Sequence, residues 1–396
     1  MLSKSLLTIQ KPKLLILGAG PVGLVAAHVM SKTCNVKLID FSIPKQKPEH
    51  FGNQVVSLIK PSLDLLGSII DLDKILMQPY SKVKCKVEES EFGFPMEASI
   101  VDVISLRYEL YSSLPKNVQF IQGSIDKIDN TDESISVYCN NEQHVAEMAL
   151  NTLGKYNVFV NTVERFDYYE MGIVSTLKLS KSNSSAFQRF LPTGPIALLP
   201  TGSDSAAIVW TLPRNIAENV LEFAKDDRSR TDLINLAFQN PEHDISFKIS
   251  NLEEQVDIAD PTYFPSIAQS SPLKSFPLGF HHLSEYGRDR LLAIGDAAHS
   301  IHPLAGMGLN LGLGDVKTLY GIVKKSSRFD PEQISIEFEK KSHFRNSSMI
   351  WACDIIHDLF ETRSTFFAGA RNLSTRFFRS QTFWSSVLSA RVNKLF

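Results

Sequence analysis

The chain has 396 residues, of which 43% are hydrophobic and 21% charged, and its formal net charge is −2 at pH 7. This length exceeds what one simple core supports, so we expect two domains, and the charge gives no whole-chain case for nucleic-acid binding. The four cysteines form no C-x-x-C pair, which favours free thiols in a reducing compartment. His281 and His282 are adjacent, and His299 and His302 lie in a glycine-rich segment. We therefore predict polar loop residues near a cofactor and no metal site.

The N-terminal segment MLSKSLLTIQKPK carries three lysines and two serines and no acidic residue. This composition is typical of a short mitochondrial targeting segment, although the usual arginines are missing. A frayed cytosolic N-terminus is the alternative. The longest apolar stretch of the chain is interrupted by a glycine turn, so no membrane span is predicted.

The first glycine-rich segment, KLLILGAGPVGLVAAHVM, begins with an apolar run at 14–17 that predicts a buried strand. Gly18, Gly20 and Gly23 follow with G-x-G-x-x-G spacing and lead into an alanine-rich helix. Gly18 permits the tight turn, Gly20 lets a pyrophosphate approach, and Gly23 lets the helix pack on the strand. The free N–H groups of the helix would then face the phosphates.

A second predicted strand, at 35–39, ends in Asp40. A carboxylate at this distance from the glycine motif can accept hydrogen bonds from ribose hydroxyls. The segment therefore predicts a dinucleotide site, with NAD, NADP and FAD all still open. Beyond it, residues 53–77 have helical periodicity around Pro61, and residues 82–104 alternate as short strands do.

The middle of the chain has a different pattern. Residues 172–212 form a series of short apolar runs separated by turn signals. Adjacent hairpins of this kind predict an antiparallel sheet, which we expect to be the substrate platform. Because the pattern of the nucleotide domain returns near residue 278, that domain is predicted to be discontinuous in sequence.

After residue 331 the pattern is helical, and the last part of the chain is basic. From Thr362 onward there is no Asp or Glu. The basic and aromatic residues of this stretch are Arg363, Phe366, Phe367, Arg371, Arg376, Phe377, Phe378, Arg379, Phe383, Trp384, Arg391 and Lys394. Such a segment can lie on an anionic membrane surface. Packing of its aromatic residues on the body of the protein is the alternative.

The second glycine-rich segment, RLLAIGDAAHSIHPLAGMGLNLGLGDV, begins with a predicted strand at 291–294 that ends at Gly295 and Asp296. Asp296 can hold ribityl hydroxyls or backbone groups near a pyrophosphate. A helix that begins between Gly306 and Asn310 can direct its N–H groups at the N1–C2=O edge of a flavin, which becomes anionic on reduction. This arrangement favours a flavin as the dinucleotide.

These two segments, with RFLPTGPIALLP (Arg189 to Pro200) between them, resemble the ubiquinone-biosynthesis branch of the class A flavoprotein hydroxylases, and most closely its eukaryotic mitochondrial members. The resemblance implies that the loop from Pro303 to Gly308 lies against the flavin ring and that the strands around RFLPTGPIALLP face the substrate and the flavin. The predicted cofactor-binding residues are Gly18, Gly20, Gly23, Asp40, Gly295, Asp296, Pro303, Gly306, Gly308, Leu309 and Asn310. No catalytic residue and no metal ligand is assigned.

The predicted fold is α/β, with a discontinuous Rossmann-like FAD-binding domain, an inserted antiparallel-sheet substrate domain and a C-terminal helical region. The expected division is FAD-binding at 1–80 with a targeting-like segment at 1–12, substrate-sheet strands at 81–104, FAD-binding again at 105–170, the substrate sheet at 171–277, FAD-binding at 278–330, and helices at 331–396.

The function that the resemblance implies is an FAD-dependent aromatic-ring hydroxylase of ubiquinone (coenzyme Q) biosynthesis. Such an enzyme transfers one oxygen of O₂ to a polyprenylated phenol through a flavin C4a-hydroperoxide. Its electron donor would be NAD(P)H or a ferredoxin with its reductase, and its partners other coenzyme Q biosynthesis proteins. It would bind peripherally to the matrix side of the mitochondrial inner membrane. A flavin hydroxylase for a small soluble phenol is a further alternative.

The chain departs from the family pattern in three places. The family's third fingerprint, G-A-D-G-x-x-S, is expected between Cys139 and Gly172, but no Asp-Gly pair occurs there. We therefore expect a central strand and its turn to be missing, which leaves a catalytically impaired isoform or interaction subunit as the second hypothesis. Gln54 and Met307 replace the usual Arg and Gln of the family. Arg107 could lie near the pyrophosphate, but a solvent-exposed helix arginine is the expectation.

Overall fold

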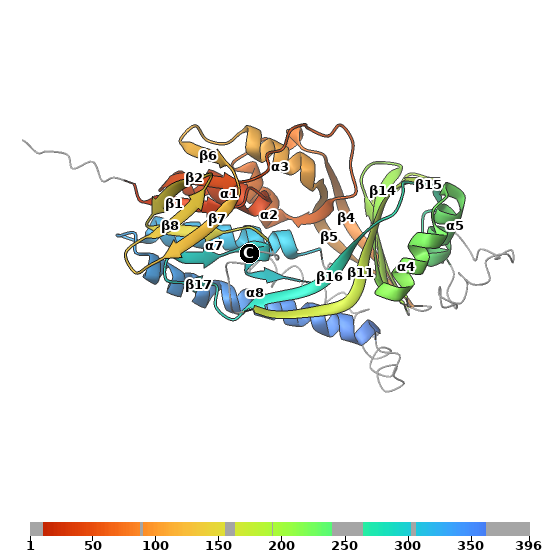
Figure 1. Cartoon of the computed structure of the whole chain (residues 1–396). Helices are drawn as coiled ribbons and strands as arrows, with labels where there is room; N and C mark the ends of the chain where they lie inside the picture. The colour runs from red at the N-terminus through yellow and green to blue at the C-terminus, as the bar shows by residue number, and fades with distance from the viewer. Residues whose placement is uncertain are drawn as a thin grey trace, which may run out of the picture.

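The computed structural model describes residues 11–87, 90–154, 163–191, 193–239, 264–301 and 306–361. Figure 1 shows two parts side by side: a mostly parallel sheet with its helices, and a larger sheet with two further helices on its far side. Pro303 and the basic C-terminal stretch from residue 362 lie outside the described residues.

Of the strands that the structure describes, six form the mostly parallel sheet, in the order β17-β18-β10-β1-β2-β6. They are β1 (Lys13–Leu17), β2 (Asn35–Asp40), β6 (Val118–Gln122), β10 (Met148–Asn151), β17 (Gly287–Arg288) and β18 (Leu291–Ala293). Residues 14–17 of β1 are at most 1% exposed, as a continuous apolar run should be in a parallel sheet covered on both faces.

Helices α1 (Pro21–Met30), α3 (Val103–Ser112), α7 (Gly308–Lys325) and α8 (Pro331–Glu361) belong to the same part of the molecule. α1 packs against β1, β2, α3 and α7, and α7 also packs against α8. The smaller elements here are α2 (Lys60–Gly67), two 3₁₀ turns, η1 (Leu72–Lys74) and η2 (Gly295–Ala297), and the sheet of β7 (Ile125–Asn130), β8 (Ile135–Cys139) and β9 (Glu142–Ala146). One apolar cluster joins the helices to the parallel sheet.

Among the described residues, ten strands form the large sheet, in the order β19-β16-β11-β14-β13-β12-β4-β5-β3, with β15 paired to β11. They are β3 (Val55–Ile59), β4 (Met77–Val87), β5 (Ser90–Asp102), β11 (Val163–Leu179), β12 (Ala186–Leu191), β13 (Gly194–Pro200), β14 (Ser205–Pro213), β15 (Ile267–Ser270), β16 (Lys274–Leu283) and β19 (His299–Ser300). Their pairing is antiparallel except between β12 and β4.

Helices α4 (Arg214–Phe223) and α5 (Asp227–Gln239) cover one face of this sheet, and their apolar side chains share a second core with it around Ile173 and the fully buried Trp210. Figure 1 shows the long strands β11 and β16 running from this core towards the parallel-sheet part, close to α8. A Rossmann-like part combined with an inserted, mainly antiparallel sheet is therefore confirmed.

The structure corrects two expectations about elements. β10 lies between β1 and β18 and pairs in parallel with both, with Leu14 opposite Met148 and Ala149 opposite Leu291. The prediction that a central strand is missing is therefore wrong, and the backbone groups of β1 keep their partners. The helical periodicity at residues 53–59 was also misleading, because β3 begins there as an edge strand of the large sheet and the helix α2 starts only at Lys60.

Candidate functional site

The three glycines of the first segment occupy three different environments. Gly18 has φ +108° and Gly20 is the N-cap of α1. A Cβ atom at Gly23 would lie 1.9 Å from the carbonyl oxygen of Gly18, whereas a Cβ at Gly20 would meet nothing within 4 Å. Gly18 therefore makes the turn, Gly23 permits close helix packing, and Gly20 leaves open space in front of the helix. No side chain of the described residues caps α1, so its first N–H groups are available to an anion.

Asp40 joins the end of β2 to this glycine turn. Its carboxylate accepts hydrogen bonds from the backbone N–H of Ala19 at 2.5 Å and of Ser42 at 2.7 Å. These contacts hold the carboxylate beside the turn, at the position where the spacing of the motif predicts a ribose.

Arg107 of α3 contributes a positive charge to the same place. Its Nε donates to the carbonyl oxygen of Ala19 at 2.8 Å, and a terminal nitrogen donates to the carbonyl oxygen of Ser42 at 2.8 Å. The same nitrogen lies 3.9 Å from a carboxylate oxygen of Asp40. The expectation of a solvent-exposed helix arginine is therefore wrong, because the guanidinium bridges the glycine turn and the end of β2.

The second glycine segment packs directly on the first. Gly295 has φ +61°, and a Cβ atom there would lie 3.1 Å from a methyl group of Val22. A Cβ at Gly312 would lie 2.6 Å from a Val22 methyl and 3.2 Å from the Cα of Gly295. The start of α1, the turn η2 and the first turns of α7 therefore meet at one point, and only glycines fit this close approach.

Of the flavin residues predicted in the second segment, Asp296 and Gly308 lie beside this meeting point. Asp296 is exposed, and a Cβ added at Gly308 would lie 3.9 Å from one of its carboxylate oxygens. Gly306 has φ +59°, and a Cβ there would lie 3.5 Å from the Cβ of Ser57. α7 begins at Gly308, and no side chain in the described part of the chain caps it. Two helix N-termini thus lie close together without side-chain caps, which suits a dianionic dinucleotide.

The side-chain amide of Asn310 is used within the protein. Its side chain is fully buried; Oδ1 accepts from the N–H of Ile59 at 3.1 Å and from the hydroxyl of Ser62 at 2.8 Å, and Nδ2 donates to the carbonyl oxygen of Ser57 at 2.8 Å. The side-chain amide therefore joins α7 to β3 and α2. Leu309, its neighbour, is partly buried against the main core.

The turn after β10 occupies the place of the family's third fingerprint. It contains Thr152, Leu153 and Gly154, and the hydroxyl of Thr152 approaches the carbonyl oxygens of both Leu17 and Gly18 at 2.8 Å. Gly154 has φ +84° and open space where a Cβ would be. The turn geometry is therefore present, but an apolar side chain stands directly before the glycine, where the fingerprint has Asp.

An apolar cluster lies next to Gly306, where the large sheet meets the start of α7 and α8. Met307 is 3% exposed and clusters with Ile59, Met96, Ile301 and Met349. Met307, noted as a departure from the family, thus packs in the protein interior. Gln54, the other substituted position, is exposed.

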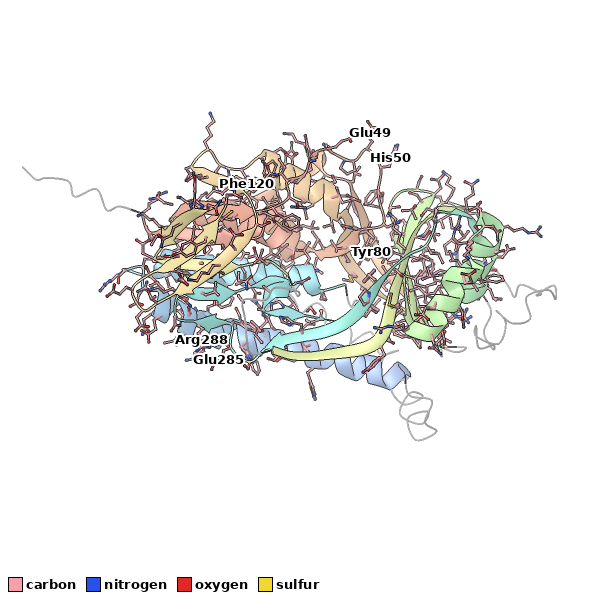
Figure 2. The ribbon with its side chains drawn as sticks, in the orientation of Figure 1. Glu49, His50, Tyr80, Phe120, Glu285 and Arg288 are labelled. Atoms are coloured by element: carbon pink, nitrogen blue, oxygen red, sulfur yellow. The ribbon has the colours of Figure 1, made fainter. Side chains whose placement is uncertain are left out.

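Tyr80 of β4 contacts this apolar surface, because its hydroxyl lies 3.7 Å from the sulfur of Met96. Its hydroxyl lies 2.8 Å from the hydroxyl of Ser57, and burial raises its pKa. In Figure 2, Tyr80 lies near the middle of the molecule, where the large sheet approaches the parallel-sheet part. A neutral phenol hydroxyl therefore lies against Ser57, whose Cβ would be 3.5 Å from a Cβ added at Gly306.

Arg189 of RFLPTGPIALLP faces away from this surface. It is 3% exposed, and one guanidinium nitrogen donates to the carbonyl oxygen of Ala237 at 2.8 Å, in the last turn of α5. A cation at a helix C-terminus is favoured by the helix dipole. This part of the implied substrate strand therefore anchors a helix on the far face of the sheet.

His281, His282 and His299, predicted as loop residues, lie in the strands β16 and β19, and His302 lies outside the described residues. His281 contacts the carbonyl oxygen of Ala297 at 3.1 Å, and His282 contacts the hydroxyl of Tyr286 at 2.9 Å. Burial, and then the neighbouring His343, lower the pKa of His282 to about 4, so this ring is neutral near pH 7. In the described part of the chain, no group of His, Cys, Asp and Glu residues is arranged to hold a metal ion.

Comparison with known proteins identifies the cofactor and the family. The model of an FAD binding domain matches residues 234–326. The ubiquinone biosynthesis monooxygenase COQ6 of Xenopus tropicalis is 29% identical over 362 residues, which is 80% of this chain and 77% of that protein. The protein of the same name in Schizosaccharomyces pombe is 24% identical over 96% of this chain and 91% of its own length. The chain belongs to this FAD-dependent monooxygenase family.

Solved structures agree on the fold. PqsL of Pseudomonas aeruginosa, described as a probable FAD-dependent monooxygenase, superposes with a TM-score of 0.69 at 17% identity, covering 92% of this chain and all of that one. HpxO of Klebsiella pneumoniae, solved with FAD and uric acid, gives a TM-score of 0.65 at 13% identity over 92% of both chains. Alignment with the zebrafish COQ6 reaches 33% identity but spans 54% of this chain and 47% of that protein.

Proposed function

We propose that this chain binds FAD between its two glycine segments and hydroxylates the aromatic ring of a polyprenylated phenol in ubiquinone biosynthesis. The observation that carries the proposal is the contact of Val22 with Gly295 and Gly312, because it brings two uncapped helix N-termini to one place. Bound FAD would supply the redox chemistry that activates O₂.

The residues of the chain have positioning roles in this scheme. The N–H groups of α1, with Gly20 in front of them, would hold the pyrophosphate, and Asp40 with Arg107 would hold the adenosine side. Asp296 and the start of α7 would hold the ribityl chain and the ring edge. The apolar cluster around Met307, together with Tyr80, would form one wall of the phenol site and keep water from the reacting atoms.

The second candidate, an impaired isoform or interaction subunit, is favoured by Leu153, which stands where the family has an acid. The presence of β10 weakens this candidate, because the sheet that carries the site is complete across its centre. The turn around Thr152 also holds Gly18 by hydrogen bonds that do not need a carboxylate.

Incubation of the purified protein with FAD, a chemical or enzymatic reductant, ¹⁸O₂ and a prenylated phenol tests the proposal. The expected product carries one ¹⁸O on the ring, as measured by mass spectrometry. Comparison of long-chain with short-chain phenols distinguishes a polyprenyl substrate from a small soluble one. Turnover by Leu153→Asp but not by the natural protein would favour the impaired isoform instead.

We further propose that the protein is mitochondrial, as the names of its relatives and the targeting-like N-terminus suggest, and that it binds the matrix face of the inner membrane through α8. Ile336, Phe344 and Trp351 of α8 are 54%, 75% and 69% exposed, and their spacing puts them on one side of the helix. Lys340 is exposed between them. None of the described helices is long and apolar enough to cross a bilayer.

The double substitution Phe344→Glu/Trp351→Glu is therefore expected to weaken sedimentation with anionic vesicles by roughly tenfold or more, because two aromatic anchors are replaced by charges of the same sign as the lipid. Val145→Glu is the matched control, since Val145 is 45% exposed on the small sheet. Equal vesicle binding by the double variant and the control would contradict this mode of attachment.

A further inference from the structure

A fully buried carboxylate, Asp315, connects the C-terminal helix to the turn that carries Asp296. Asp315 lies on α7, about two helical turns beyond its start. Its two carboxylate oxygens face different elements of the fold, and each oxygen accepts hydrogen bonds from the element that it faces. The network joins the second glycine segment to Arg345 and Asn346 of α8, and the proposed function gives Asp315, Arg345 and Asn346 no role.

One oxygen of Asp315 faces the turn η2. It accepts from the backbone N–H of Gly295 at 3.0 Å and lies 2.6 Å from Nε2 of His299. These two residues flank Asp296 in sequence. The carboxylate therefore holds the short segment that presents Asp296 from both of its ends.

The other oxygen faces α8. It accepts from a terminal nitrogen of Arg345 at 2.5 Å and from Nδ2 of Asn346 at 3.1 Å. Arg345 is 6% exposed, and its other terminal nitrogen donates to the hydroxyl of Thr318 at 3.0 Å. Arg345 and Asn346, two adjacent residues of α8, thus donate the hydrogen bonds to the carboxylate oxygen that faces away from the cofactor site.

The charge of this carboxylate depends on its partners. Burial alone would raise the pKa of Asp315, but the interactions with His299 and with Arg345 leave it below its ordinary value. A buried carboxylate that loses a cationic partner is strongly destabilised. The parts of the network most able to move in response are the three-residue turn η2 and the short strand β19, since Asp315, Arg345 and Asn346 lie within long helices.

We propose that Arg345 and Asn346 are positioning residues for FAD, which act through Asp315 to hold Gly295 and His299 and so fix the orientation of Asp296. This inference rests on the proposed FAD site. It assigns to α8 a role in cofactor affinity although α8 itself lies behind α7.

Arg345→Met, with Arg230→Met as matched control, tests this role. Arg230 is 5% exposed, pairs with Asp227 at 2.8 Å and donates to the carbonyl oxygen of Ser270 at 2.7 Å, all at the far end of the large sheet. Both variants are expected to lower the melting temperature of the apoprotein. Only Arg345→Met is expected to raise the Kd for FAD, by roughly tenfold or more, and to change the visible circular dichroism of the bound flavin.

Two further variants keep the test informative if Arg345→Met folds poorly. Arg345→Lys retains the charge and is expected to restore part of the FAD affinity. Because an Asn side chain needs no counter-charge, Asp315→Asn/Arg345→Met is expected to bind FAD more tightly than Arg345→Met alone.

Equal FAD affinity in Arg345→Met and Arg230→Met would overturn the inference and leave the network a structural one. Failure of the natural protein itself to bind FAD would instead overturn the proposed function, and the inference with it.

Discussion

Gly23→Ala is expected to lower the free energy of unfolding of the apoprotein by about 3 kcal/mol, because an added methyl group must displace α1 from the strand below it. The new Cβ would lie 1.9 Å from the carbonyl oxygen of Gly18 and 2.5 Å from the hydroxyl of Thr152. Neither can withdraw, since one is backbone and the other holds that same turn by hydrogen bonds. Denaturant unfolding of the FAD-free protein measures the effect.

Gly20→Ala is the matched control for this prediction. A Cβ at Gly20 meets no protein atom within 4 Å, so the free energy of unfolding should change by less than about 0.5 kcal/mol. Its FAD affinity should nevertheless fall by roughly tenfold, because the methyl group would point into the space left for the pyrophosphate. Equal loss of stability in both variants, or unchanged FAD affinity in Gly20→Ala, would contradict the division of roles between the two glycines.

Asp296→Ala is expected to abolish retention of FAD through gel filtration, while the unfolding of the apoprotein changes little because this side chain is exposed. A charged hydrogen-bonding group lost from a ligand contact weakens binding by roughly a hundredfold, or ~2.7 kcal/mol. Asp296→Asn, which keeps an oxygen acceptor, should lie between the natural protein and the alanine variant. The molar ratio of FAD to protein in the eluted peak is the measurement, and an unchanged ratio in Asp296→Ala would refute the assignment of this residue.

The parts of the site that could be predicted from the sequence are those set by local geometry. Gly18, Gly20 and Gly23 follow a strand and begin a helix. Their spacing alone therefore predicts a tight turn at Gly18, close approach of a pyrophosphate at Gly20, and packing of the helix on the strand at Gly23. Asp40 ends the next strand of the same unit and could be placed for the same reason. The packing of Gly295 and Gly312 on Val22 could not be predicted from the sequence. That the two segments bind one cofactor together was expected only from their resemblance to one family.

The parts that could not be predicted depend on contacts between distant residues. Arg107 binds the carbonyl oxygen of Ala19, 88 positions earlier in the chain, and nothing around Arg107 in the sequence indicates that turn. Asn310 resembles a cofactor ligand by position, yet its amide is used by residues of β3 and α2 some 250 positions away. β10 could not be predicted because three apolar residues followed by Asn151, without the expected Asp-Gly turn, carry too little local signal for a strand.

Arg189 illustrates a related limit. The alternation of β12 shows that Arg189 and Phe187 share one face, but only the packed structure shows that this face is covered by α4 and α5. The segment RFLPTGPIALLP can therefore be typical of a family although its charged residue, Arg189, anchors a helix on the far face of the sheet.

The two glycine segments are expected to form one FAD site although the acid of the third fingerprint is replaced by Leu153. Equilibrium titration of the purified FAD-free protein with FAD, followed by flavin fluorescence and absorbance, measures this binding. We expect saturation at one FAD per chain, with a dissociation constant on the order of micromolar or below. A protein that remains folded and colourless in excess FAD would show that the two segments do not form such a site.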